Sequence, residues 1–185
     1  NALKGIERAA KVVQNAISSK MFVGVLWDTD TDGATAGAIM SRYLQCFLPN
    51  VQTYINQGKM HGLANQDLSQ FEQLDLLIIV DSLDENINQY AWLANMGVEV
   101  VILDHHVVKD NIPYDQYVKL VSSQIDYPNP ALSGAGVTWK FCKYLDEILG
   151  VNYADDYMDL AACGIVADMC DLSENSMENR YIVKC

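Results

Sequence analysis

Three short apolar segments of this chain each end at an aspartate. They are residues 21–27 before Asp28, residues 76–80 before Asp81, and residues 98–103 before Asp104. Short runs rich in β-branched residues are typical of strands that are covered on both faces of a parallel sheet. Because right-handed crossovers make such strands parallel, the residues that follow them gather along one edge of the sheet. The sequence therefore predicts that three acidic clusters meet in space.

The segments between these runs supply helices. Apolar residues at spacings of three and four predict a helix over residues 2–19. Further helical segments and one further strand follow from the same patterns: helices at 34–48, 86–96 and 157–167, a helix that starts in the Gly-rich segment 132–140, and a strand at 51–55. The predicted fold class is α/β, with a mostly parallel sheet flanked by helices.

The composition limits the domain organisation and the cellular setting. With 185 residues, half of them hydrophobic, the chain can bury one large core, so we expect a single domain over residues 1–185. No apolar run reaches the length of a membrane span, which is about 20 residues.

The five cysteines are scattered without a CxxC pair, which is typical of reduced thiols and favours the cytoplasm. The chain begins at Asn1 and stops within a helix-like run, so we interpret it as a fragment of a longer protein.

The net charge of -12 bears on the partners of the chain. A surface this acidic repels a phosphate backbone unless metal ions or a separate basic module offset the charge.

The densest acidic cluster is the segment 28–33, DTDTDG, in which Asp28, Asp30 and Asp32 alternate directly after a strand. Carboxylates this close repel one another, and a divalent cation relieves that repulsion. The segment matches the first six positions of an EF-hand calcium loop, but the twelfth position is Ile39 where that loop needs Glu. The pattern therefore predicts a metal site of another kind, followed by a helix N-terminus that favours phosphate.

The other clusters are weak signals alone. Asp81 and Asp168 each follow an apolar segment, where a single aspartate is ordinarily a turn residue or a cap. Asp104, His105 and His106 form a stronger signal, because neutral imidazole binds Mn²⁺, Fe²⁺ or Zn²⁺ and a neighbouring carboxylate can orient the ring. The Gly-rich segment 132–140 fits either close packing or a phosphate contact.

The order of these motifs resembles the DHH family of phosphoesterases. DTDTDG, VDS, LDHH and GIVADM look like the family's motifs one to four, and LDHH is the most specific of them. The segments LSGAGVTWKF and ENRYIVK resemble RecJ-like members, and His61-Gly62-Leu63 looks like the family's GHGL-type segment. The resemblance covers roughly residues 21–184.

The resemblance implies a set of site residues. The implied metal ligands are Asp30, Asp32, Asp81, His105 and Asp168, with Asp28 as an auxiliary ligand. His106 matches the histidine that faces the scissile phosphate, and Asp104 matches the acid that supports the histidine pair. Asp81 is expected to bridge two metals.

Two departures from the family pattern stand out. Leu26 replaces a histidine found in some members, so ligation of the first metal is expected to rely on carboxylates. The family's C-terminal substrate-binding domain, with its Gly-Gly-His signature, is absent from this sequence.

By resemblance the expected function is phosphodiester hydrolysis by a RecJ-like 5′-to-3′ exonuclease on single-stranded DNA. Mostly oxygen ligands with one imidazole favour two Mn²⁺ ions, with Mg²⁺ next. The alternative is a small-substrate phosphodiesterase or phosphatase that acts on oligoribonucleotides, pAp or cyclic dinucleotides. A non-catalytic scaffold that binds replication or repair proteins, or acts with additional domains, is a third interpretation that the intact motifs disfavour.

Overall fold

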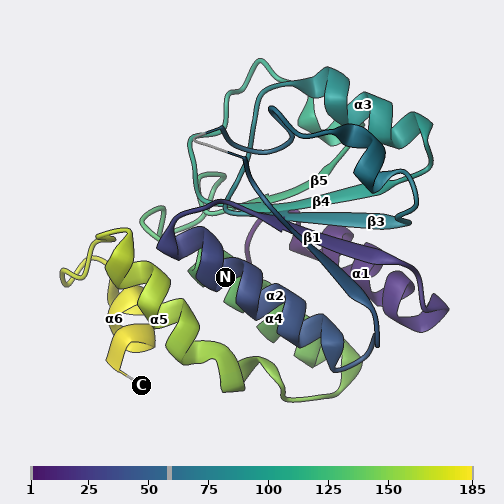
Figure 1. Cartoon of the computed structure of the whole chain (residues 1–185). Helices are drawn as coiled ribbons and strands as arrows, with labels where there is room; N and C mark the ends of the chain where they lie inside the picture. The colour runs from purple at the N-terminus through teal and green to yellow at the C-terminus, as the bar shows by residue number, and fades with distance from the viewer. Residues whose placement is uncertain (1, 58–59, 185) are drawn as a thin grey trace.

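The computed structural model describes residues 2–57 and 60–184, and within them five strands form one parallel sheet (Figure 1). The strands are β1 (Val23–Trp27), β2 (Val51–Ile55), β3 (Leu76–Val80), β4 (Glu99–Asp104) and β5 (Lys119–Ser122). Their order in the sheet is β2-β1-β3-β4-β5. The order reverses between β1 and β3, and in open α/β sheets this switch point is where ligands bind, beyond the carboxyl ends of the strands.

Helices cover both faces of the sheet (Figure 1). They are α1 (Ile6–Ser19), α2 (Thr31–Gln45), α3 (Ile87–Asn95), α4 (Gly134–Leu149), α5 (Met158–Ala167) and α6 (Met177–Lys184), with short 3₁₀ turns at Leu68–Phe71, Tyr114–Gln116 and Ala154–Tyr157. Helix α3 lies on one face, and α1, α2 and α4 lie on the other. Helix α5 packs against α2 and α4, and α6 packs against α5. The predicted α/β fold with a parallel sheet between helices is confirmed.

Alternate residues of the strands fill two separate cores. Ile78 and Val101 belong to the core under α1, α2 and α4, whereas Leu77, Ile79 and Val100 belong to the core under α3. Successive side chains of a strand point to opposite faces, so a strand covered on both sides has to be apolar throughout. This explains why the central strands read as continuous apolar runs.

The predicted elements are present, with shifted ends and one omission. Helix α2 begins at Thr31, three residues before its predicted start, because the Asp30 side chain caps it by accepting a hydrogen bond from Gly33 N at 2.8 Å. Helix α1 begins at Ile6, after Gly5 in the left-handed conformation with φ of 82°. Strand β5 was not predicted.

The cysteines differ from one another in burial. Among the residues that the structure describes, Cys46, Cys142, Cys163 and Cys170 are free thiols. Cys142 is buried, whereas Cys46 and Cys163 are exposed. Cys185 lies outside the described residues. Across residues 2–57 and 60–184, no helix combines the length and the apolar character needed to cross a membrane.

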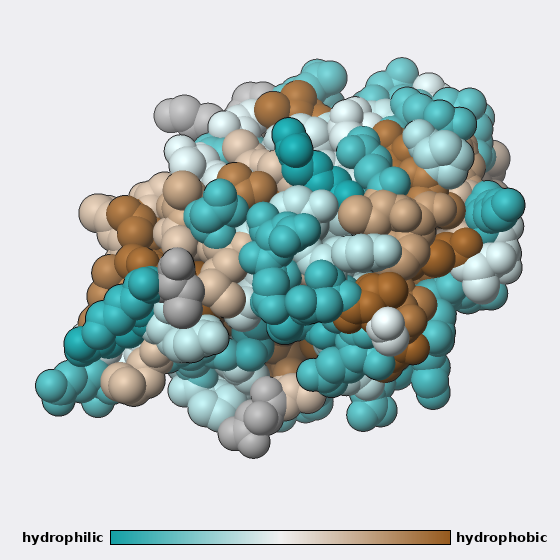
Figure 2. Space-filling view, turned by 90° about the horizontal axis from the view of Figure 1, so that it is seen from below, coloured by the Kyte–Doolittle hydropathy of each residue, from teal (hydrophilic) through white to brown (hydrophobic). Residues whose placement is uncertain are grey.

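The surface below the sheet is mixed in character. Figure 2 shows this side of the molecule, with brown hydrophobic groups separated by teal hydrophilic ones. Exposed apolar residues near the C-terminal end of α5 and on α6 are Val166, Met169, Met177 and Tyr181. The apolar groups in this view are therefore scattered among polar ones.

Asp146 of α4 joins the end of the following loop to α2, and it provides a test of the fold. Its buried carboxylate accepts hydrogen bonds from Tyr43 Oη at 2.9 Å, Ala154 N at 2.9 Å and Tyr153 N at 3.2 Å. We expect Asp146→Ala to lower the free energy of unfolding by about 2 to 4 kcal/mol, because it leaves buried donors without partners. Urea titration measures this change. Asp155→Ala, which removes a half-exposed ion pair, should cost less than about 1 kcal/mol, and equal losses would contradict the assigned role.

Candidate metal centre

The carboxyl ends of β1, β3 and β4 bring the predicted site residues together. Asp32 lies in the first turn of α2 after β1, Asp81 follows β3, Asp104 ends β4 and His105 follows it. These ends flank the switch point of the sheet. The predicted meeting of three acidic clusters is therefore what the fold produces.

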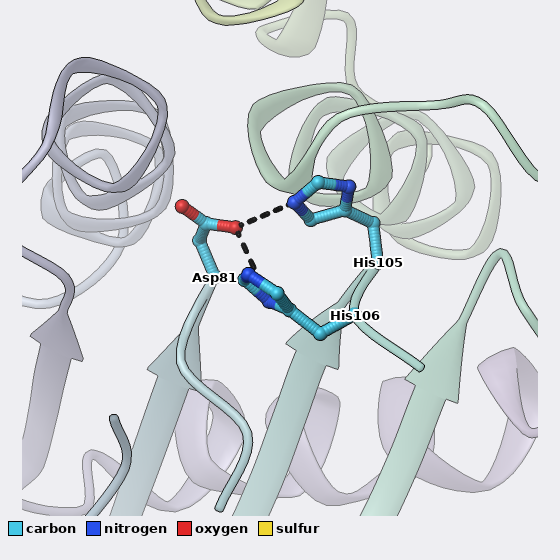
Figure 3. A group of neighbouring side chains, drawn as sticks. All are labelled: Asp81, His105 and His106. Carbon is cyan, nitrogen blue, oxygen red and sulfur yellow. Dashed lines mark ion pairs between the residues drawn. The ribbon is translucent and has the colours of Figure 1, made fainter. Parts of the chain in front are cut away.

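Asp81 is the most constrained of these residues. It is 1% exposed and adopts a left-handed backbone conformation with φ of 53°, which is uncommon for a residue other than glycine. Its Oδ1 atom is buried without a hydrogen-bond partner among the described residues. That oxygen lies 3.1 Å from His105 Nε2 and 4.0 Å from His106 Nδ1, and Figure 3 shows both imidazole rings directed toward it. A buried carboxylate oxygen that has no hydrogen-bond partner and faces two imidazoles is a ligand atom that can bind a cation.

The protonation of Asp81 reflects this position. Burial raises the pKa of the Asp81 carboxyl to about 7, despite the opposing contact with His105. Burial also disfavours the charged form of His105, but its contact with Asp81 outweighs burial and raises the pKa of the imidazole. The two groups therefore favour a shared proton in the metal-free protein, and a divalent cation would replace that proton.

Asp104 holds His106 in place. Its fully buried carboxylate accepts hydrogen bonds from Leu83 N at 2.8 Å and His106 N at 2.5 Å, and its Oδ1 lies 3.0 Å from His106 Nδ1. This hydrogen bond raises the pKa of His106 to about 9. Burial opposes the charge on Asp104, but His106 outweighs it and lowers the pKa of the carboxyl. Asp104 therefore favours the protonated form of His106, whose side chain is 41% exposed.

Asp32 ties the site to α4. Its carboxylate accepts hydrogen bonds from Gly134 N at 2.7 Å and Ala135 N at 3.0 Å, at the N-terminus of that helix. Burial raises the pKa of Asp32 even though these hydrogen bonds oppose the shift. Asp32 Oδ2 also lies 3.7 Å from His105 Nε2. The free backbone N–H groups at the N-terminus of α4 are therefore bound by the carboxylate of Asp32.

The glycines of the segment 132–140 serve close packing. A side chain at Gly134 would collide with Asp81, since a Cβ there would lie 2.6 Å from Asp81 Cγ. A side chain at Gly164 of α5 would collide with the Asp32 carboxylate and with Ala135. Of the two roles that the sequence left open for the Gly-rich segment, the geometry favours packing.

The remaining predicted ligands lie at different distances from this centre. Asp168 follows the last residue of α5, is partly exposed, and places Oδ2 3.9 Å from His105 Nδ1. Asp30 uses one carboxylate oxygen to cap α2. Asp28 is largely buried, and its Oδ1 accepts a hydrogen bond from Thr29 N. The structure thus groups Asp168 with His105 and leaves Asp28 and Asp30 at the rim.

Two adjoining sets of potential ligand atoms fit a metal centre. One set comprises Asp81, His105 and His106, and the other Asp32, His105 and Asp168, with all ligand atoms of a set within 4.8 Å of one another. The sets share His105. Carboxylate oxygens with one or two imidazoles are donors that suit Mn²⁺ or a similar divalent ion. The unbonded oxygen of Asp81 and the crowding of buried acids both agree with cation binding.

His61 also lies at this centre, although it was given no role from the sequence. Its Nδ1 lies 3.4 Å from Asp28 Oδ2, and its ring centroid lies 4.9 Å from that of His106. All three histidines of the chain therefore converge at the carboxyl edge of the sheet. The HGL segment was the only sequence signal, since no periodicity places a loop residue beside a strand end.

Comparisons with known proteins identify the family of this chain. The model of the DHH family, N-terminal domain, matches residues 23–165. The protein named SPbeta prophage-derived single-strand DNA-specific exonuclease YorK of Bacillus subtilis strain 168 is 30% identical over 185 residues, which cover 98% of this chain and 31% of that protein. The single-stranded-DNA-specific exonuclease RecJ of the same organism is 30% identical over 186 residues, which cover 97% of this chain and 23% of RecJ.

Solved structures of RecJ also match this chain. A crystal structure of exonuclease RecJ bound to manganese matches all of this chain and 47% of its own, with a TM-score of 0.87 and 30% identity. RecJ from Thermus thermophilus in complex with Mn²⁺ matches all of this chain and 26% of its own, with a TM-score of 0.84 and 30% identity. The chain spans about a third or less of the length of the curated relatives described above.

Proposed function

Because this chain belongs to the DHH family, we propose that it is a metal-dependent phosphodiesterase of the RecJ type that degrades single-stranded DNA in the 5′-to-3′ direction. The observation that carries the proposal is the pair of potential ligand sets that share His105, at the edge of the sheet where Asp104 also holds His106. The relatives named as single-strand exonucleases support the choice of substrate.

We assign two divalent ions to the centre, with Mn²⁺ as the preferred ion and Mg²⁺ as a substitute. The ligands would be Asp30, Asp32, Asp81, His105 and Asp168, with Asp28 as an auxiliary ligand. The solved structures of RecJ with Mn²⁺ and with Mg²⁺ support this choice. When bound, such ions lower the pKa of a water molecule and neutralise charge on the phosphoryl group.

The side chains of the protein prepare the site for an anion. Asp104 accepts from the Nδ1 atom of His106 and keeps that ring protonated, so the exposed edge of the ring can donate to a phosphate oxygen. The largely buried position of Asp81 and Asp32 makes their interaction with cations stronger than it would be in water. His106 and Asp104 thus stabilise negative charge that develops on phosphorus oxygens.

A small phosphodiester substrate is the second candidate. The net charge of -12 favours it, because a long DNA strand would be repelled by the surface of this chain. We propose that further domains of a longer protein, in the cytoplasm, supply the basic surface that a strand requires. The small-substrate function is then the correct one only if the chain cleaves pAp or a dinucleotide in preference to DNA.

Labelled substrates separate the two candidates. With Mn²⁺, we expect 5′-labelled single-stranded DNA to release labelled mononucleotide at once, while 3′-labelled DNA shortens gradually. Faster cleavage of pAp or a dinucleotide than of DNA would replace the exonuclease proposal by the small-substrate one. The full-length protein is the reference for this comparison. A titration that shows no Mn²⁺ binding would contradict both and favour a scaffold.

A further inference from the structure

Two aspartate-histidine pairs lie next to each other at the carboxyl edge of the sheet, one joined by a hydrogen bond and the other by a looser contact. In one pair His106 Nδ1 lies 3.0 Å from Asp104, and in the other His61 Nδ1 lies 3.4 Å from Asp28. The side chains of His106 and His61 are 41% and 42% exposed, and both aspartates are buried. The Nδ1 atom of His61 is itself buried, so the exposed part of the ring is the edge away from Asp28. In each pair the outer edge of the imidazole ring is therefore exposed to solvent.

The backbone around His61 is fixed on both sides. Asn56 Nδ2 donates to Met60 O at 2.7 Å, and Gly62 N donates to Ser82 Oγ at 2.8 Å. Gly62 has a φ of 60°, and a side chain there would collide with Asp84.

The same loop is anchored to the strand that carries Asp81. Asn56 Nδ2 also donates to Ser82 Oγ at 2.7 Å, and Leu63 N donates to an Asp84 carboxylate oxygen at 2.5 Å. Ser82 and Asp84 follow Asp81 closely in the chain. The position of His61 is therefore set by the segment that forms the centre, as a residue that contacts the substrate requires.

We infer that His61 is a second phosphate-contacting residue, which with His106 holds two oxygens of the phosphoryl group from adjacent positions. The inference rests on the proposed function, because it takes the ligand to be the phosphate of a phosphodiester. With centroids 4.9 Å apart, the two rings are close enough for both to reach one phosphoryl group. An imidazole ring has two nitrogens, so a ring that faces a carboxylate with one of them can direct the other toward a phosphate oxygen.

Ligation of a metal by His61 is less consistent with the geometry. In the part of the chain that the structure describes, His61 belongs to no set of three potential ligand atoms within 4.8 Å of one another. Its inward nitrogen already faces Asp28. The outer edge of the ring faces solvent, where an incoming phosphate arrives.

Phosphate affinity tests this assignment directly. We expect His61→Ala to weaken the binding of inorganic phosphate to the Mn²⁺-loaded protein by roughly tenfold or more, measured by calorimetry, because a hydrogen bond to a charged group is lost. Mn²⁺ affinity, measured by electron paramagnetic resonance of the free ion, should stay at the wild-type value. His61→Gln should restore part of the phosphate affinity, since its amide can donate.

Met60→Ala is the matched control, because Met60 is the exposed neighbour of His61 and contributes only its carbonyl to the loop. It should bind phosphate and Mn²⁺ as the wild type does. Weaker Mn²⁺ binding in both His61 variants would make His61 a metal ligand and overturn the inference. Equal phosphate affinity in wild type and His61→Ala, or no phosphate binding by the wild type, would overturn it too.

The same titrations separate the inference from the proposed function. If the wild type binds Mn²⁺ and phosphate but cleaves no phosphodiester, the proposed function fails, and the phosphate affinities of the variants still decide the role of His61. If the wild type cleaves single-stranded DNA and His61→Ala keeps the wild-type phosphate affinity, the proposed function is supported. The inferred contact between His61 and phosphate is then wrong.

Discussion

Asp81→Asn is expected to abolish metal-dependent phosphodiester hydrolysis while it stabilises the metal-free protein. The amide keeps the shape of the carboxyl group, and asparagine tolerates the left-handed backbone with φ of 53° better than most residues do. The change therefore removes a charge and leaves the fold intact. We expect the transition state to lose about 4 kcal/mol of stabilisation by the metal ions. This loss corresponds to a fall in turnover of roughly a thousandfold.

The gain in stability follows from the burial of Asp81. At pH 8 the metal-free wild type has to hold an ionised carboxylate at a site that raises its pKa to about 7, beside Asp32 and Asp104. A raised carboxyl pKa means that folding favours the protonated form, so stability is lost as the pH rises from the ordinary carboxyl pKa through about 7. The uncharged amide escapes this penalty, and we expect the free energy of unfolding to rise by roughly 1 to 3 kcal/mol.

Two measurements check this prediction. Thermal unfolding at pH 8 should give a higher midpoint for metal-free Asp81→Asn than for the wild type, and added Mn²⁺ should raise the midpoint much more for the wild type. Asp115→Asn, which alters an exposed ion pair with Arg8, should change neither activity nor midpoint. Turnover of Asp81→Asn near the wild-type rate would show that Asp81 is not a ligand.

Gly134→Ala should damage the same site through packing alone. Its new Cβ would lie where Asp81 now packs, and the Gly134 N–H that binds Asp32 would move with the backbone. We expect the free energy of unfolding to fall by about 1 to 3 kcal/mol, the usual cost of overpacking. Turnover should fall by roughly a hundredfold, because displacements of about 1 Å at a reacting centre have effects of this size.

Gly150→Ala is the matched control at the other end of α4. Gly150 has a φ of 70°, and a Cβ added there would meet no other atom within 4 Å, so alanine should cost only about 1 kcal/mol of backbone strain. Steady-state hydrolysis of labelled DNA and urea unfolding measure both variants. If the two substitutions reduce turnover equally, the loss comes from general destabilisation and the packing of Gly134 against the ligands is not its cause.

The sequence predicted the sheet well because its central strands are buried on both faces. A run of five apolar residues such as 76–80 is typical of a strand between two apolar layers, and its bounds agree with those of β3. Strand β5 escaped prediction because its four residues, KLVS, are too few and too mixed to show a period. The start of α2 was placed too late because Asp30 was treated only as a ligand, whereas it also caps the helix.

The site was predictable where residues follow strand ends and unpredictable where loops set the geometry. Parallel strands bring Asp81 and His105 to one edge without further information. The left-handed backbone of Asp81 and the approach of His61 depend on tertiary contacts with other segments, which no local pattern encodes. Which of the predicted ligands bind an ion stays a prediction for the titrations described above.

The distribution of the acids along the chain has a consequence for biosynthesis. Residues that meet at the carboxyl edge extend from Asp28, after the first strand, to Asp168, after α5. A chain emerging from the ribosome therefore carries a mutually repelling group of carboxylates long before α5 can dock against α2 and α4. We expect cation uptake to be coupled to that late docking step, so that the availability of metal during synthesis influences the yield of folded protein.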